Sequence, residues 1–343
     1  MTESALLQPD ELRVQSGRAQ AIVAELDRIL LGRGELHRFV VMAILSRGHV
    51  LLEGVPGVGK TALAKGLGDI LGLELRRVQF TPDLMPSDIL GANILQESGG
   101  SREMVFRPGP IFANILLADE INRASPKTQS ALLEAMQERA VTLLGTTRQL
   151  PAPFFVIASQ NPIEFEGTYP LPEAQIDRFL FRLHVGNVDA NVLEEIISTR
   201  RRGEPPTPQR TLGAGELDAL FAAVEAIFLP RAVARYIARL VNATHPGSDE
   251  QVDAVTTYVT LGASPRAAIA IAEAARAEAL LAGRPTAGFD DVRRVAAPVL
   301  NHRIILNYRA RVDGITTMRV IDELLAGVDE TGMRLPQDVA VRA

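Results

Sequence analysis

The eight residues from Gly54 to Thr61 read GVPGVGKT, between the apolar run HVLLE and the helical stretch ALAKGLGDILG. Gly54, Gly57 and Gly59 let the backbone curl so that successive N–H groups point at one anion. The helix that follows would present the positive end of its dipole to the same anion. Lys60 adds a full charge for the phosphates, and Thr61 offers a hydroxyl to Mg²⁺. Although a glycine-rich loop could carry this motif by chance, its strand–loop–helix setting predicts a phosphate-binding loop.

Short apolar runs alternate with helical patterns, and such runs are typical of strands buried in a parallel sheet. They cover residues 49–53, 114–118, 154–159 and 179–185, and residues 73–80 alternate between apolar and polar as a further strand would. Residues 92–107 and 140–150 have the pattern of two hairpins. The alternation predicts an α/β fold with a mostly parallel sheet and helices on both faces.

The chain changes character near residue 201, which suggests a division into domains. We expect an N-terminal arm at residues 1–15, an α/β core at 16–200, a linker rich in proline and arginine at 201–210, and a helical domain at 211–343. No convincing strand is predicted in the helical domain.

Composition excludes several classes of function. The chain of 343 residues contains no cysteine, which rules out disulfides, thiol catalysis and cysteine-ligated metals. The N-terminus lacks the pattern of a signal peptide, and no apolar run is long enough to span a bilayer. A net charge of −5 is not the footprint of a nucleic-acid-binding protein. We therefore expect a cytoplasmic protein without membrane insertion, for which nucleic acid is an unfavoured partner.

Two adjacent carboxylates, Asp119 and Glu120, end the buried run NILLADE. A carboxylate at a strand tip beside a phosphate loop can hold Mg²⁺, and its neighbour can orient the attacking water. A solvated acidic pair at a strand end is the alternative. The phosphate loop upstream favours the catalytic interpretation.

Two further candidates follow the later strands. Asn161 comes after the run FFVIAS, where its amide could contact the γ-phosphate or the attacking water, or simply begin a turn with the next proline. Arg178 could stabilise transition-state charge, but a surface pair with Asp177 or Glu173 is the default interpretation of its surroundings.

Arg266 lies in the first turn of a predicted helix that Ser264 caps and Pro265 begins. A cation at this position opposes the helix dipole, which is locally unfavourable. The sequence therefore suggests an anionic partner for Arg266.

The phosphate-loop proteins include several classes. A GTPase would carry an Asn-Lys-x-Asp signature, and no lysine of this chain follows an asparagine. The chain instead resembles the MoxR family of AAA+ ATPases, in the clade that also holds magnesium-chelatase motor subunits and MCM helicases. The segments that carry the resemblance are GHVLLEGVPGVGKT, VQFTPDLMPSDILG, GPIFANILLADEINRASPKTQSALLEAMQER, FFVIASQNPIEFEGTYPLPEAQIDRF and GASPRA.

The resemblance implies an AAA+ core with a small all-α C-terminal lid, and ATP with Mg²⁺ as ligands. It implies Walker B at Asp119 and Glu120, sensor 1 at Asn161, an arginine finger at Arg178 that reaches a neighbouring subunit, and sensor 2 at Arg266, in cis or in trans. Thr61 and Asp119 would be the metal ligands. Walker A comprises Gly54, Val55, Pro56, Gly57, Val58, Gly59, Lys60 and Thr61.

The resemblance also implies a homo-oligomeric ring, usually a hexamer, whose hairpins at 92–107 and 140–150 line or face a central pore. The expected activity is that of a chaperone-like motor that remodels a client, with a von Willebrand factor A (VWA) domain protein as partner in trans. One alternative is the motor subunit of a metal chelatase. A nucleic-acid motor is a weaker one, which basic residues on the hairpins keep open: Arg102, Arg107 and Arg148.

Overall fold

The structure, a computed structural model, describes residues 6–98, 101–162, 167–200 and 204–330. Parts of the predicted arm, hairpin turn, linker and helical domain therefore lie outside the described residues, at 1–5, 99–100, 201–203 and 331–343. The chain forms two compact units. Val14–Ala222 is one, and the described residues of Met1–Arg13 and Ala223–Ala343 form the other.

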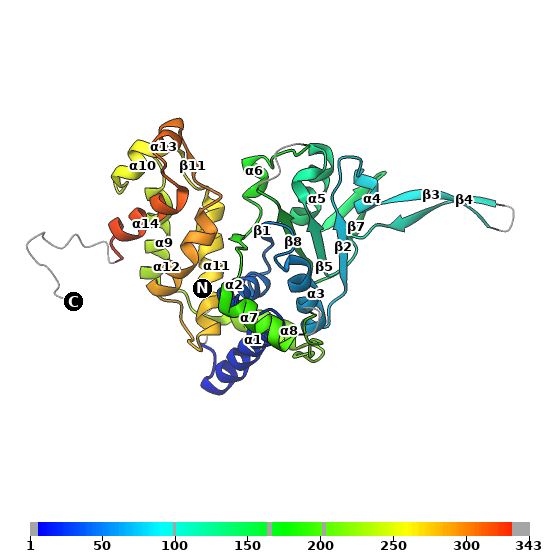
Figure 1. The fold of residues 1–343 in the computed structure, drawn as a ribbon, viewed down its shortest axis with the longest axis horizontal. Helices are drawn as coiled ribbons and strands as arrows, with labels where there is room; N and C mark the ends of the chain where they lie inside the picture. Colours follow the sequence, from blue (N-terminus) through cyan, green and yellow to red (C-terminus); the bar gives the residue numbers. More distant parts are fainter. Residues whose placement is uncertain (1–5, 99–100, 163–166, 201–203, 331–343) are drawn as a thin grey trace, which may run out of the picture. The chain divides into compact units, whose positions relative to one another are not determined.

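A five-stranded parallel sheet organises the unit of residues 14–222, as the alternating pattern predicts (Figure 1). Its strand order is β2-β5-β8-β1-β9, so every connection crosses over a face of the sheet. The strands are β1 (Val50–Glu53), β2 (Leu75–Gln79), β5 (Ile115–Asp119), β8 (Phe155–Gln160) and β9 (Phe181–His184).

Helices accompany this sheet, and residues that typically begin or end a helix stand at the ends of two of them. Gly72 ends α3 in the left-handed conformation, and Ser125 caps α5 through the Thr128 N–H, with Pro126 as the first helical residue. The helices are α1 (Pro9–Ile29), α2 (Gly34–Leu45), α3 (Lys60–Leu71), α4 (Pro86–Leu90), α5 (Pro126–Glu138), α6 (Glu173–Ile176), α7 (Ala190–Thr199) and α8 (Glu216–Ala226). A 3₁₀ turn, η1, covers Ile121–Arg123.

Helix α1 begins earlier than the sequence pattern suggested. Its first residue, Pro9, lies inside the segment expected to be an arm, and Asp10 and Glu11 occupy its first turn. Proline and acidic side chains both favour a helix start, because they suit the unpaired N–H groups and the dipole there.

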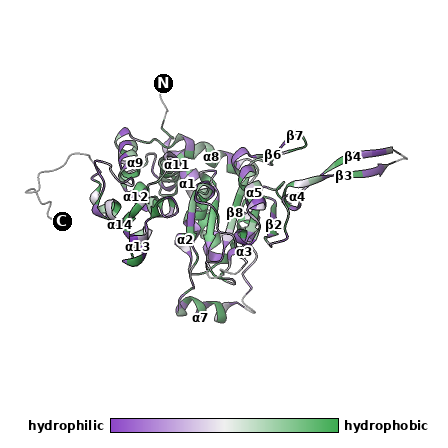
Figure 2. Ribbon diagram, turned by 90° about the horizontal axis from the view of Figure 1, so that it is seen from above, coloured by the Kyte–Doolittle hydropathy of each residue, from purple (hydrophilic) through white to green (hydrophobic). Residues whose placement is uncertain are grey.

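Apolar side chains fill both faces of the sheet, whose central strands Figure 2 shows as mainly hydrophobic. On one face Leu116 and Ala118 of β5 belong to a buried cluster with Leu132 and Met136 of α5. On the other, Phe181 of β9 meets Phe39 of α2 edge to face at 5.5 Å. Strand side chains alternate between faces, so a strand covered on both sides must be apolar throughout.

Both predicted hairpins are confirmed. Gly91–Ser98 (β3) pairs with Ser101–Pro108 (β4), and Ala140–Leu143 (β6) pairs with Thr146–Gln149 (β7). Figure 1 shows β3 and β4 extending away from α4 and β2. Their place in a pore stays a prediction.

The second unit is mainly helical, as expected, and includes the end of α8. One detail was not predicted: β10 (Val259–Leu261) and β11 (Ile305–Leu306) form a short antiparallel pair. Its helices are α9 (Arg231–Ala243), α10 (Asp253–Tyr258), α11 (Pro265–Leu281), α12 (Phe289–Leu300), α13 (Tyr308–Val312) and α14 (Thr317–Gly327). Among the described residues, no helix combines the length and apolar character needed to cross a bilayer.

A buried histidine links β1 to β8. His49 precedes β1, and its Nδ1 accepts a hydrogen bond from the Val156 N–H at 3.0 Å. Burial lowers the pKa of His49 to about 4, to which the positive charge of Arg139 adds. The folded unit therefore holds this imidazole neutral at pH 7.

This burial predicts a pH-dependent loss of stability. Below the usual pKa of 6.5, the unfolded chain takes up a proton that folded His49 refuses until about pH 4. The contribution of neutral His49 to the free energy of unfolding is therefore complete above pH 6.5. It is lost as pH falls, by about 2 kcal/mol between pH 7 and pH 5. Hydrogen exchange of the β8 amides, corrected for intrinsic rates, measures it. His49→Gln should lower the free energy of unfolding at pH 7 but make it depend less steeply on pH between pH 7 and pH 5. An unchanged pH dependence would contradict the assignment.

Candidate functional site

The predicted phosphate loop connects β1 to α3. Gly57 and Gly59 have φ values of 84° and 92°, which side-chain-bearing residues rarely adopt. Gly54 is needed for a different reason, because a Cβ there would lie 2.5 Å from the Val185 carbonyl oxygen. Gly57 and Gly59 thus allow the loop backbone to curl, and Gly54 leaves space for the Val185 carbonyl.

Lys60, the first residue of α3, is buried at the base of this loop. Its Nζ donates to the Gly54 carbonyl at 2.5 Å. Burial lowers the pKa of Lys60, while the nearby charges of Asp119 and Glu120 oppose that shift. The ammonium is therefore held by a backbone oxygen beside two carboxylates, where an anionic ligand could replace the backbone contact.

Asp119 ends β5 and is buried among polar groups of both neighbouring strands. The Ser159 hydroxyl of β8 donates to its Oδ1 at 2.5 Å. From the other side, the Arg77 guanidinium of β2 donates to its Oδ2 at 2.7 Å. Charge-assisted bonds of this kind are short and strong, so the carboxylate is fixed from two sides.

Glu120 has a left-handed backbone with φ 57°, which turns it away from the strand. Its N–H donates to the Ser159 hydroxyl oxygen at 3.0 Å. Its Oε2 accepts from Gln79 Nε2 at 2.7 Å and from Arg123 Nη1 at 3.0 Å. The carboxylate is therefore held by a strand amide and by a guanidinium three residues along.

Sequence reasoning missed the partners of both carboxylates. Arg77 and Gln79 are two positions apart on β2, so they lie on the same face of the strand. That spacing was a visible signal, but it points to Asp119 and Glu120 only once the pairing of β2 with β5 is known.

One cavity of about 390 Å³ joins the loop to the carboxylates. It is lined by Pro56, Gly57, Gly59, Lys60, Thr61, Ala62, Arg77, Gln79, Asp119 and Glu120. Its oxygen donors, the Thr61 hydroxyl and the two carboxylates, suit Mg²⁺, which in phosphate sites takes few protein ligands and keeps several waters. The donor set thus fits Mg²⁺.

Asn161 follows β8 and is buried beside the loop. The Gly54 N–H donates to the carbonyl of the preceding residue, Gln160, at 3.2 Å. The strand end and the loop are therefore adjacent, as the sequence interpretation of Asn161 requires.

The two arginines near β9 differ in their surroundings. Arg182 Nε is 2.7 Å from Glu53 Oε2, so it is paired at the end of β1. Arg178 follows α6 and is half-buried, and among the described residues its Nε has no hydrogen-bond partner. Neither arginine is among the described residues that line the 390 Å³ cavity. Arg266 belongs to the other unit, in the first turn of α11.

A second, smaller cavity of about 200 Å³ was not predicted. It is lined by Gly32, Arg33, Gly34, Glu35, Leu36, His184, Gly186, Asn187 and Val188. Residues of the phosphate loop lie close to chain neighbours of this lining: a Cβ on Gly54 would lie 2.5 Å from the Val185 carbonyl oxygen, and one on Gly59 would lie 3.6 Å from Leu30.

Comparison with known proteins shows which families and proteins this chain resembles. Residues 49–181 match the ATPase family associated with various cellular activities (AAA), and residues 251–324 match the AAA lid domain. The chaperone MoxR1 of Mycobacterium tuberculosis is 44% identical over 319 residues, which cover 93% of this chain and 82% of that protein. The uncharacterized protein YeaC of Bacillus subtilis is 42% identical over 309 residues, 89% of this chain and 92% of that one.

A solved structure agrees. The crystal structure of a candidate ATPase from Cytophaga hutchinsonii superposes with a TM-score of 0.85 at 37% identity, covering 93% of this chain and 97% of that chain. The predicted fold class, a parallel-sheet core with a helical lid, is therefore confirmed.

The contacts of Lys60 predict its effect on nucleotide binding. Lys60→Ala should lower ATP affinity by about 100-fold or more, since a buried ammonium–phosphate contact contributes up to ~3 kcal/mol. Displacement of a fluorescent ATP analogue measures this. Lys65→Ala is the matched control, because Lys65 is an exposed lysine on the same helix. Normal ATP affinity in the Lys60 variant would contradict the phosphate-loop assignment.

Proposed function

Since the chain belongs to the MoxR family of AAA+ ATPases, we propose that it hydrolyses Mg-ATP and uses the energy to remodel or mature a client protein. The observation that carries the hydrolysis is the 390 Å³ cavity, where a glycine-rich loop, a buried lysine and two carboxylates converge. Binding and catalytic groups for a triphosphate are thus supplied together by β1, α3, β2 and β5.

The loop holds the phosphates. Lys60 exchanges the Gly54 carbonyl for β- and γ-phosphate oxygens, and the loop N–H groups at the start of α3 surround the anion. The 200 Å³ cavity takes the adenine base, because its lining residues at 32–36, 184 and 186–188 are neighbours in the chain of residues close to the loop.

Thr61 and Asp119 hold the metal. When bound, Mg²⁺ supplies positive charge that neutralises the phosphate oxygens in the transition state. Asp119 has lone pairs beyond those that Ser159 and Arg77 use, so it would be able to hold Mg²⁺ as well. Arg77 keeps this carboxylate oriented while it does so.

Glu120 acts as the general base. Its carboxylate accepts a proton from the attacking water, whose oxygen forms the new bond to the γ-phosphorus as the bond to the β–γ bridging oxygen breaks. Gln79 and Arg123 bind the same oxygen, Oε2, and leave Oε1 outside those two bonds. These two partners position the base, and Asn161 at the neighbouring strand end contacts the γ-phosphate or the water.

Arg178 completes the site of a neighbouring subunit. Among the described residues its Nε has no hydrogen-bond partner, and it lies outside the 390 Å³ cavity. Both observations suit an arginine whose partner is a phosphate on another chain. Arg182 is a weaker choice, because its guanidinium is paired with Glu53. Head-to-tail contacts of this kind close into a ring, and six subunits is the proposed number. We assign Arg266 to sensing the nucleotide state, in cis or in trans.

The proposal also includes a role in remodelling a client protein and a partner protein for that role. A relative of 44% identity is named a chaperone, which supports remodelling of a protein substrate. The expected partner is a VWA-domain protein supplied in trans. Arg148 lies over the Phe106 ring at 3.9 Å, so this hairpin arginine is engaged within the chain and gives the nucleic-acid alternative little support.

The position of Glu120 predicts the behaviour of its amide variant. Glu120→Gln should bind ATP normally and hydrolyse it about 10²- to 10⁴-fold more slowly, because the amide fills the same space but cannot accept the proton. Calorimetry gives the affinity and phosphate release the rate. Glu134→Gln, an exposed glutamate on α5, is the control. Near-normal turnover in Glu120→Gln would exclude it as the base.

The same variant tests the client role. Glu120→Gln held in ATP is used for affinity capture from the native cell, with Lys60→Ala, captured without added ATP, as the matched bait of weakened nucleotide binding. The proposal expects a VWA-domain protein enriched only with the ATP-loaded bait. Chelatase subunits or nucleic-acid-binding proteins in its place would overturn the proposed role while leaving the ATPase assignment intact.

A further inference from the structure

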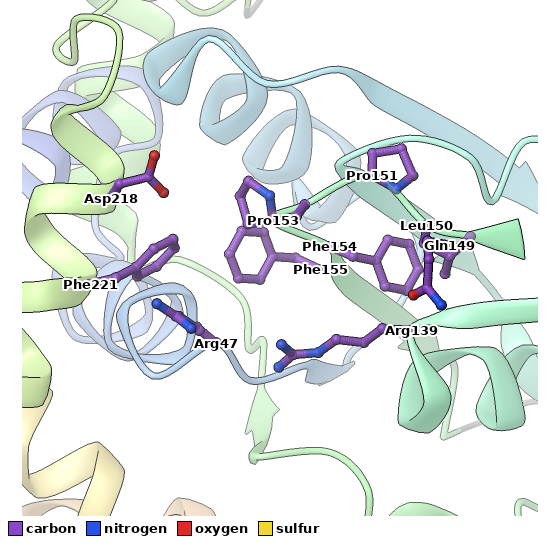
Figure 3. Close-up of a pocket in the computed structure, with 11 residues that line it drawn as sticks. Arg47, Arg139, Gln149, Leu150, Pro151, Pro153, Phe154, Phe155, Asp218 and Phe221 are labelled. Carbon is purple, nitrogen blue, oxygen red and sulfur yellow. The ribbon is translucent and has the colours of Figure 1, made fainter.

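A third cavity, of about 430 Å³, lies within the unit of residues 14–222 and has no part in the proposed reaction (Figure 3). Phe155, the first residue of β8, lies on its floor, whereas the nucleotide loop follows the carboxyl end of the adjacent strand β1. The six residues of β8 span about 20 Å, so opposite ends of the sheet carry the two cavities.

The floor of this rear cavity is aromatic. Phe154, Phe155 and Phe221 are all buried, and the rings of Phe155 and Phe221 are 6.4 Å apart. Leu150 and Pro153 add further apolar surface. Ligand cavities are mainly apolar and aromatic with a few placed polar groups, and their volumes begin at about 300 Å³. The rear cavity exceeds this volume, and its lining combines aromatic side chains with charged and polar ones.

Two arginines supply the polar groups. Arg47 and Arg139 come from different elements, and Figure 3 shows both guanidinium groups at the same side of the cavity. The Arg47 guanidinium lies over the Phe221 ring at 4.7 Å. Among the described residues, the guanidinium of Arg139 forms no hydrogen bond or ion pair. A planar guanidinium with donors to spare suits a carboxylate or phosphate.

The charge balance favours an anion. Asp218 is the lining residue of opposite charge, and Figure 3 shows it across the cavity from Arg139. His49, which stacks edge to face on Phe154 beneath the floor, is neutral at pH 7. Two arginines and one carboxylate therefore line the cavity, so its lining residues carry more positive than negative charge.

We propose that the rear cavity binds an organic anion, an aromatic or branched apolar group that carries a carboxylate or phosphate. The apolar group rests on the phenylalanine floor, and Arg47 and Arg139 hold the charged head. A free organic acid and the carboxy-terminal residue of a peptide share this chemistry.

Such a ligand would contact residues at the base of the second hairpin, formed by β6 and β7. Arg139 immediately precedes β6, Gln149 ends β7, and both line the cavity. The Arg139 carbonyl accepts from the Leu150 N–H at 2.9 Å, which closes the base of the hairpin. A ligand on Arg139 and Phe155 would hold that base against the start of β8.

A pair of probes with the same ring and opposite charge tests the proposal. Hydrocinnamate (an anion) and phenethylamine (a cation) are titrated into the full chain without nucleotide, by ligand-observed NMR. Hydrocinnamate should bind with a Kd on the order of 1 mM, which is typical of so small a ligand. Phenethylamine should bind at least about tenfold more weakly, a ~1.4 kcal/mol preference for the anion. Equal binding of the two probes, or no binding of hydrocinnamate, would overturn the proposal.

The arginines are tested with substitutions that suit their backbone. Both have positive φ, 52° and 50°, and asparagine tolerates that conformation better than alanine does. The double variant Arg47→Asn/Arg139→Asn should lose at least about tenfold in hydrocinnamate affinity, with Arg235→Gln on α9 as the control. Unchanged ATP affinity shows that the variant is folded. Retained hydrocinnamate affinity in it would contradict the assignment.

The source of the anion is distinguished with acetyl-Gly-Gly-Phe as the free acid and as the amide. Tighter binding of the peptide acid than of hydrocinnamate supports a peptide carboxy terminus as the ligand. Weaker or equal binding supports a free organic acid. Bound acid should also slow hydrogen exchange in residues 139–155 but not in the loop at 54–61. Equal affinity of peptide acid and amide, or protection confined to the loop, would overturn the site.

Discussion

The proposed nucleotide site depends on the hydrogen bonds of the Asp119 carboxylate. It accepts from Ser159 on β8 and from Arg77 on β2, so it joins its own strand to both neighbours at the carboxyl edge of the sheet. Because β5 is covered on both faces by apolar side chains, this edge is where polar groups can gather. The same Ser159 hydroxyl also accepts from the Glu120 N–H, which places the proposed base relative to the metal ligand.

Each of the three charged residues that line the site, Lys60, Asp119 and Glu120, has a hydrogen-bond partner within the chain. Lys60 rests on the Gly54 carbonyl, Asp119 on Arg77, and Glu120 on Gln79 and Arg123. Each charge-assisted hydrogen bond is worth roughly 1.5–3 kcal/mol, so a bare cluster of this kind would be costly to bury. Nucleotide binding must therefore exchange internal contacts for phosphate contacts, which couples occupancy of the loop to the positions of the two carboxylates.

Much of the fold and the central part of the site could be predicted from sequence, because their signals are local. The loop from Gly54 to Thr61 and the carboxylates after NILLA each depend on a few adjacent residues. The roles of Arg77 and Gln79 could not, since their partners follow from the register of β2 against β5. The pair of β10 with β11 was missed because strands of three and two residues carry no periodicity. The rear cavity brings together residues from 47 to 221, which no local motif connects.

The proposal that a neighbouring subunit completes the site can be tested directly by mixing two inactive variants. Arg178→Ala keeps its nucleotide loop but lacks the finger, and Lys60→Ala keeps the finger but cannot load ATP. In an equal mixture that exchanges subunits, about a quarter of the sites pair an intact loop with an intact finger. ATP hydrolysis should therefore reappear, and should not when the double variant Lys60→Ala/Arg178→Ala replaces Lys60→Ala. A mixture no more active than its separate components would contradict the shared site.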